Sequence, residues 1–345
     1  MVRYCFLSWV LVLLPTSVVG QEQKPVSTFA EGMSAYDRKD YAKALEVFRQ
    51  LAAEGNAEAQ CLLGAMYFWG NVVARQDYEE AARWYRKAAE QGHADAQHSL
   101  GLMYGSGKGV RQDYEEAARW YRKAAEQGNA NAQFNLGLMS ARGEGVLQNQ
   151  AEAFKWFLKA AEQGSADAQF NLGLMSTRGE GVLQNQAEAV KWFRKAAEQG
   201  NAAAQQFLGG FYRSGEGVPQ DYAEAVKWFR KAAEQGNVMG QYGLGFMYDS
   251  GQGVPQDYAE AVKWYRKAAE QGELGAQYAL GLQYSVGQGV PQDYMQAHMW
   301  LNLAASRAQG DELKQCSEAR DRVAMKMTPQ QLAEAQRMAR EWKPK

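Results

Sequence analysis

The residues that could do chemistry are few, and the histidines are the first to consider. The chain has three of them, His93, His98 and His298, and none is spaced as in a His-x-x-x-His zinc motif; there is also no Cys-x-x-Cys pair. Metal sites need such clustered ligands. We therefore expect no bound metal ion and no catalytic role for these side chains.

Two other patterns resemble parts of enzyme sites. The string Gly-Ser-Gly-Lys-Gly at 105–109 has the glycines of a phosphate-binding loop, but it lacks the Lys-Ser/Thr ending and follows no strand pattern. Glu90, Glu126 and Glu162 could act as the paired acids of a hydrolase. They recur every 36 residues beside Lys and Arg, however, which is typical of solvated helix faces. We expect neither enzyme activity nor a cofactor.

Ten tryptophans could stack sugars or nucleobases, but most of them occupy one repeated position. Seven are spaced by 36 residues: Trp84, Trp120, Trp156, Trp192, Trp228, Trp264 and Trp300. A large ring at one position of an amphipathic pattern is typical of packing in a core or between repeats. Trp69 lies outside this register, beside Phe68, and we expect it to be exposed.

The same 36-residue interval defines the elements that position these side chains. Each unit contains two amphipathic helical patterns, as at 94–106 and 114–127, joined by a Gly-x-Gly-Val loop. Asp113 and Glu116 form the pattern of a capping box at the start of the second helix. Gly128 ends that helix in the left-handed conformation, and Asn129 caps the next one. This regular alternation predicts an all-α fold.

The unit resembles the Sel-1-like repeat, a relative of the tetratricopeptide repeat. The resemblance rests on Ala-x-Ala-Gln-x-x-Leu-Gly-x-Met-Tyr, then Gly-x-Gly-Val, then Glu-Ala-x-x-Trp-Tyr-Arg-Lys-Ala-Ala-Glu-Gln-Gly, all within 94–128. It implies a right-handed α-α superhelical solenoid of helix-turn-helix repeats. We assign 21–56 to an N-terminal capping helix pair, 57–308 to seven repeats and 309–345 to C-terminal capping helices.

The first twenty residues, 1–20, have the pattern of a signal peptide. Arg3 precedes an apolar run at 5–14 that is too short to span a membrane, and Val18-x-Gly20 offers a small-residue cleavage site. An uncleaved anchor is the alternative. The pattern predicts a periplasmic or secreted protein, with no further transmembrane segment. Removal of 1–20 leaves 37 basic and 39 acidic side chains without a basic stripe, which argues against nucleic acid as a partner.

Two cysteines remain after such processing, Cys61 and Cys316. Export favours disulfides, but these residues lie at opposite ends of the repeat array, whereas a bridge needs Cα atoms within roughly 7 Å. We expect both thiols to be free and buried, with an intermolecular bridge as the alternative.

The resemblance implies a scaffold that binds a protein or peptide, and we expect it to be monomeric. Sel-1-like proteins assemble complexes, act in signalling or mediate host contact. The alternative is an enzyme or binder acting on peptidoglycan or β-lactams, as described for disulfide-rich bacterial members, but the cysteine pairs of those repeats are missing here. A role in the lumen of eukaryotic organelles is the third possibility, and the absence of an Asn-x-Ser/Thr site argues against it.

In tetratricopeptide relatives the first helix of each repeat lines the concave surface, which implies a set of candidate partner-binding residues. They are Phe68, Trp69, His98, Phe134, Arg142, Phe170, Arg178, Gln206, Arg213, Tyr242, Phe246 and Tyr278. Aromatic and arginine side chains are typical of interface hot spots. We predict that the three arginines form a positive strip for an acidic or C-terminal peptide segment. Pairing of Arg142 and Arg178 with the nearby Glu144 and Glu180 is the alternative.

Two repeats depart from the family pattern within this candidate surface. Ser140 and Ser176 stand where the first helix of other repeats has Tyr. The missing rings could widen the groove there or loosen its packing.

Overall fold

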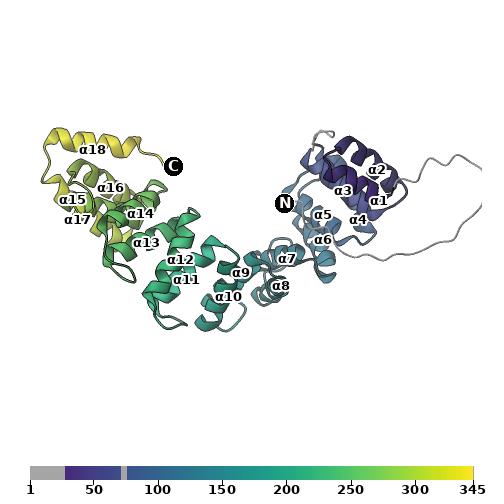
Figure 1. Ribbon diagram of the computed structural model, residues 1–345, viewed down its shortest axis with the longest axis horizontal. Helices are drawn as coiled ribbons and strands as arrows, with labels where there is room; N and C mark the ends of the chain where they lie inside the picture. The colour runs from purple at the N-terminus through teal and green to yellow at the C-terminus, as the bar shows by residue number, and fades with distance from the viewer. Residues whose placement is uncertain (1–27, 71–75, 345) are drawn as a thin grey trace, which may run out of the picture. The chain divides into compact units, whose positions relative to one another are not determined.

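The computed structural model describes residues 28–70 and 76–344, and these residues form eighteen α-helices and no strand (Figure 1). The predicted all-α repeat solenoid is thereby confirmed. None of the described helices is both long and apolar enough to cross a membrane. The predicted signal peptide lies outside the described residues.

The first of two compact units ends at Ala88, within the fourth helix. Its helices are α1 (Phe29–Asp37), α2 (Tyr41–Ala53), α3 (Ala57–Trp69) and α4 (Tyr78–Glu90). Val47 and Phe48, which replace the Trp-aromatic pair of the repeats, are buried against Leu63 of α3. The helix pair α1–α2 therefore covers the apolar face of the first repeat, as a cap must.

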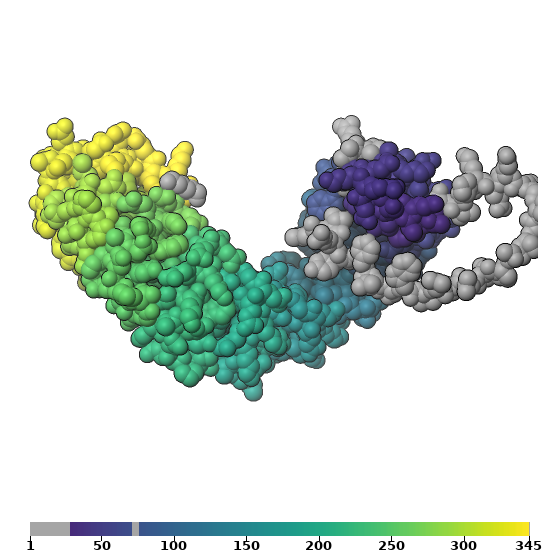
Figure 2. Space-filling model, in the orientation of Figure 1, coloured from purple at the N-terminus to yellow at the C-terminus, as the bar shows by residue number. Residues whose placement is uncertain are grey.

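The second unit, from Ala89 onward, holds six helical hairpins and two further helices. The hairpins are α5 (Ala94–Ser106) with α6 (Tyr114–Glu126), α7 (Ala130–Arg142) with α8 (Gln150–Glu162), α9 (Ala166–Arg178) with α10 (Gln186–Glu198), α11 (Ala202–Ser214) with α12 (Tyr222–Glu234), α13 (Val238–Ser250) with α14 (Tyr258–Glu270), and α15 (Leu274–Val286) with α16 (Tyr294–Arg307). The two helices of a hairpin pack on each other, and the second helix also packs on the first helix of the next hairpin, so the hairpins follow one another as bands of successive colour in Figure 2. We call the odd-numbered helices α3 to α15 helix A and the even-numbered helices α4 to α16 helix B.

The core of each hairpin repeats one set of contacts. In α7 and α8, for example, Leu136, Ala153 and Phe157 are almost fully buried. The Phe157 ring lies against the backbone of α7 at Gly137, where an added Cβ would be 2.7 Å from the ring. A side chain at the glycine of the Leu-Gly pair would thus push the two helices of the hairpin apart.

The capping box predicted for helix B forms only in part. Asp113 accepts a hydrogen bond from the backbone N–H of Glu116, at 2.9 Å, as expected. The returning bond is absent because the Asp113 N–H donates to the carbonyl of Tyr104 in helix A. The Glu116 carboxylate instead pairs with Arg119, at 3.1 Å. Within the described chain, both halves of the box are present at α1 and α18 (Pro329–Glu341).

A ladder of buried glutamines joins successive repeats, and we did not predict it. In α11, Gln205 Nε2 donates to the carbonyl of Ala197, at 3.0 Å. Its Oε1 accepts from Nε2 of Gln235, which lies at the end of α12, at 2.7 Å. The same pair of bonds recurs at Gln97, Gln133, Gln169 and Gln241. Buried amides with both groups satisfied fix the spacing of the repeats.

The ladder predicts that the same substitution, Gln to Leu, lowers the free energy of unfolding by different amounts at two positions. Gln205→Leu leaves the Gln235 amide without its buried acceptor, so we expect a loss of about 1–2 kcal/mol in unfolding free energy. Gln277 ends the ladder, and its Oε1 is buried without a partner in the described chain, since Arg307 replaces the next glutamine. We expect Gln277→Leu to cost less than about 1 kcal/mol. Urea unfolding followed by circular dichroism measures both, and equal costs would contradict the ladder.

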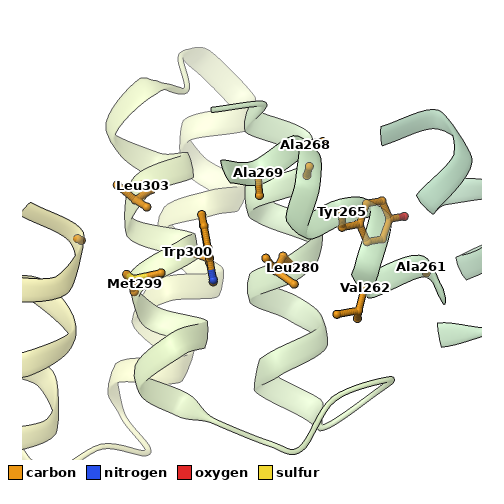
Figure 3. Packing of buried hydrophobic residues seen from close by; sticks show 11 residues of the cluster. Ala261, Val262, Tyr265, Ala268, Ala269, Leu280, Met299, Trp300 and Leu303 are labelled. Atoms are coloured by element: carbon orange, nitrogen blue, oxygen red, sulfur yellow. The ribbon is translucent and has the colours of Figure 1, made fainter. Parts of the chain in front are cut away.

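The last repeat is followed by α17 (Gly310–Ala324) and α18, within the segment 309–345 that we assigned to C-terminal capping helices. Both pack on α16. Trp300 of α16 lies between Met299, Leu303 and Leu280 in Figure 3, and the ring of Trp342 packs edge-on against it, with centroids 6.1 Å apart. The cap therefore buries the apolar face that the array would otherwise leave open.

Candidate protein-binding surface

The candidate position two residues before the helix A leucine is half-buried. It holds His98, Phe134, Phe170, Gln206, Tyr242 and Tyr278. The rings of Phe134 and Phe170 pack on the helix B rings of Phe157 and Phe193, with centroids 5.7 Å apart in both pairs. These side chains give part of their surface to packing and leave the remainder for a partner.

His98 is held as a neutral side chain at this position. Its Nε2 lies 3.0 Å from Nδ2 of Asn135 in the next helix A, and its ring is tilted against Tyr121. Burial lowers the pKa of His98 to about 4, and the negative charge of Asp95 opposes this only in part. At neutral pH the imidazole therefore adds polarity to the surface without charge.

The position after the helix A glycine carries an apolar row in the second unit. Its residues are Leu102, Leu138, Leu174, Gly210, Phe246 and Leu282. Leu102 is 44% exposed, and a Cβ added at Gly210 would meet no atom within 4 Å. The row thus consists of half-buried and exposed apolar side chains with a notch at Gly210.

The three candidate arginines are exposed but do not share one register. Arg142 and Arg178 are the last residues of α7 and α9, and their guanidinium groups lie 3.8 and 3.7 Å from Glu144 and Glu180. The alternative of local ion pairs therefore occurs in the structure. Arg213 lies one residue earlier in its helix, rotated by about 100°, and it stacks over the Phe246 ring at 5.2 Å.

In the first unit, Trp69 is 60% exposed, which confirms the expectation for this residue. Its neighbour Phe68 is half-buried, and the two rings meet edge-on with centroids 5.1 Å apart. Phe68 also contacts Tyr78 at the start of α4. An aromatic surface is thus available at the end of α3.

Ser140 and Ser176 are buried and do not open onto the surface. Their hydroxyl groups have no hydrogen-bond partner in the described chain. Both repeats also replace the first tyrosine of helix B, by Gln150 and Gln186. In each of these two repeats, the tyrosines of both helices are therefore replaced together. We did not recognise this paired replacement from the sequence.

The repeated tryptophans are packing residues, as predicted. In each helix B from α4 to α14, the lysine three residues later lies over the indole ring, with Nζ 4.1 to 4.3 Å from the centroid. Shallow depressions of about 520 and 530 Å³ lie beside Trp192 and Trp156, lined by these lysines and by glutamates. One indole face is thus covered by a cation, which disfavours stacking of a sugar or base there.

The described residues contain no group of three or more His, Cys, Asp or Glu side chains that could hold a metal ion. His93 caps α5, where its Nδ1 accepts from the N–H of Ala96 at 3.3 Å. Cys61 and Cys316 are both buried and are not bonded to each other, as expected. Nothing in this part of the chain favours the peptidoglycan or β-lactam alternative.

Comparison with known proteins identifies the repeat. The Sel1 repeat family profile matches seven consecutive segments, at 57–93, 94–129, 130–165, 166–201, 202–237, 238–273 and 275–308. The chain belongs to the Sel1 repeat family. No curated protein matches it. Sel1 repeats generally mediate protein–protein interactions, and that is the class of function that this fold carries.

Solved structures of two bacterial proteins resemble most of this chain. A protective antigen of uropathogenic Escherichia coli with an SLR fold is 30% identical, with a TM-score of 0.57, over 91% of this chain and 90% of that one. A Sel1 repeat protein from Oxalobacter formigenes is 36% identical, with a TM-score of 0.63, over 73% of this chain and 99% of that one. The resemblance therefore extends over nearly the full length of both relatives.

Proposed function

We propose that this protein is an exported scaffold that binds a protein partner through its helix A surface. We define that surface as the candidate residues of α5 to α15 named above together with the apolar row Leu102, Leu138, Leu174, Gly210, Phe246 and Leu282, all in the second unit. Phe68 and Trp69 of α3 form a separate candidate surface in the first unit. The observation that carries the proposal is the contrast between two sets of positions. The Leu, Gly, Ala and Gln positions of the frame are buried and repeat with few changes, whereas the helix A surface varies and exposes Leu102 and the three arginines.

The arginines suggest the charge of the partner. The bonds of Arg142 and Arg178 to their local glutamates join side chains that are about half exposed, and such pairs contribute at most about 1 kcal/mol. A partner carboxylate can therefore take the place of the local glutamate at little cost in free energy, and its contact with the arginine is less exposed to solvent. An acidic or C-terminal peptide segment therefore fits the ends of α7, α9 and α11.

Reversal of these charges tests the proposal. We expect the triple variant Arg142→Glu, Arg178→Glu, Arg213→Glu to lose its partner, because like charges then face the acidic segment. A matched triple on helix B, Arg119→Glu, Lys155→Glu and Lys191→Glu, makes the same change of charge on exposed side chains elsewhere and should keep it. Affinity capture from the envelope fraction of producing cells, quantified by mass spectrometry, compares the two. An unchanged partner list in the first triple contradicts the proposal.

Export is supported by the sequence pattern at 1–20. We expect the protein isolated from producing cells to be found outside the cytoplasm, with Gln21 as its first residue. Fractionation followed by mass spectrometry of the N-terminal peptide measures this. An intact Met1 together with a cytoplasmic location would show that the export part of the proposal is wrong.

A further inference from the structure

One buried position of the repeat frame has changed from apolar to polar. Gln283 of α15 occupies the place that Met103, Met139, Met175 and Met247 hold in other helices A. It is only 6% exposed, and burial of an amide is costly unless its groups are hydrogen-bonded. Its Nε2 donates to Oδ1 of Asp249 in α13, at 2.7 Å. Its Oε1 is buried and has no partner within the described chain.

Asp249 is the second unusual residue of this pair. The equivalent positions hold Gly105, Ala141, Thr177, Arg213 and Ser285, so a carboxylate is not part of the repeat frame. The side chain is half-buried, and burial raises its pKa, while hydrogen bonds from Gln283 and Tyr265 oppose this shift. No basic side chain of residues 28–70 or 76–344 forms an ion pair with it.

Two tyrosines, Tyr242 and Tyr265, lie near this carboxylate. Tyr242, Phe246 and Asp249 are spaced i, i+4, i+7 along α13 and therefore share a face of that helix. The Tyr265 hydroxyl donates to Oδ2 of Asp249, at 3.4 Å. One face of the Phe246 ring is covered by the Arg213 guanidinium group, 5.2 Å from the ring centroid, so we do not count this ring as part of the site. Ring faces beside an acceptor carboxylate are the surroundings in which protein cations bind.

We propose that Asp249, Gln283 and Tyr265, with the ring of Tyr242, form a receptor for one cationic side chain, arginine or lysine, of the bound partner. The incoming group donates to the free lone pairs of Asp249 and, after a small rotation of the amide, to Gln283 Oε1. The inference rests on the proposed function and sharpens it. The partner segment carries acidic groups toward the ends of α7 to α11 and a basic group at α13 and α15, which gives it a direction along the array.

Selection of peptides on the full chain tests this inference. The probe is a phage-displayed library of random dodecapeptides, panned against the native protein. We expect the selected sequences to share an Arg or Lys at one position. Binding of such a peptide should fall about tenfold in Asp249→Asn, and about tenfold when its basic residue becomes Met, without a further loss when both changes are combined.

Gln283→Met is the second variant, because it restores the residue of the other repeats and removes the orphan oxygen. It should fold at least as stably as the native chain and still bind the peptide more weakly. Two results would contradict the receptor but not the scaffold function. The selected peptides could lack a shared basic position, or they could bind Asp249→Asn and Gln283→Met as tightly as the native chain. If no peptide is selected at all, both the receptor and the helix A binding surface are contradicted.

Discussion

Gly209→Ala is expected to destabilise the repeat array by about 2–3 kcal/mol, whereas Gly210→Ala in the same helix should stabilise it by about 0.5–1 kcal/mol. A Cβ at 209 would lie 2.7 Å from the Phe229 ring, while a Cβ at 210 meets no atom within 4 Å. The ring has little room to move aside, because a Cβ built at Gly243 of the next helix A would also lie only 2.8 Å from it. Position 210 has room for a methyl group and gains from the lower entropy of the unfolded chain.

Urea unfolding of the two variants beside the native chain measures this difference. The double variant Gly209→Ala, Phe229→Leu serves as the control, because a smaller side chain at 229 relieves the collision and should recover part of the loss. Shifts of the same sign in the two single variants would contradict the close approach of Phe229 to helix A.

Gly181→Ala is expected to cost more than about 3 kcal/mol, and Gly164→Ala only about 1 kcal/mol, although both glycines have a positive φ. The φ angles are +69° and +92°. A Cβ at Gly181 would lie 2.3 Å from the carbonyl oxygen of Gln150 at the start of α8, whereas a Cβ at Gly164 meets nothing within 4 Å. The first variant must therefore move its loop away from the preceding repeat, and the second carries only the cost of its backbone conformation.

Hydrogen exchange distinguishes these two effects. We expect faster exchange at the first turn of α8 and in the loop between α9 and α10 for Gly181→Ala, and no change at these sites for Gly164→Ala. Equal exchange in the two variants would mean that the loop does not pack on the preceding helix B.

The helices could be predicted from the sequence because their signals are local. The pattern at 94–106 and the one at 114–127 correspond to α5 and α6 to within one residue. Gly128 and Asn129 act as predicted, the first with a φ of +94° and the second as the N-cap of α7. A period of 36 residues repeats each of these signals, so the number and order of helices follow directly.

Contacts between residues far apart in the sequence could not be predicted in the same way. The capping box of Asp113 loses its second bond to a carbonyl nine residues earlier in helix A. The glutamine ladder pairs side chains 30 residues apart, such as Gln127 and Gln97. Glutamine recurs at both positions in most repeats, so these residues could be seen in the sequence. Only the packing of neighbouring repeats shows that they are hydrogen-bonded to each other.

Among the candidate surface residues, the exposure of Trp69 could be predicted, whereas the packing contacts of the half-buried residues could not. Trp69 was expected to be exposed because it breaks the register, and it is. The ring of Phe170 shares its surface between α10 and the next helix A, where it contacts Phe193 and Phe207. The bond between Asp249 and Gln283 spans 34 residues. In the sequence, the sign of this bond is that Gln283 replaces the methionine of most other helices A. This replacement could be interpreted only once the structure placed Asp249 beside it.

Photocrosslinking in the producing cell tests the central claim, that helix A is the protein-binding surface, most directly. A photoreactive phenylalanine analogue is placed at position 102 or 178 on helix A, and at position 191 on helix B as the control, since Arg178 and Lys191 are both exposed. We expect positions 102 and 178 to form adducts with the same protein and position 191 to form none with it. Adducts of equal strength at position 191, or none at either helix A position, would contradict the account.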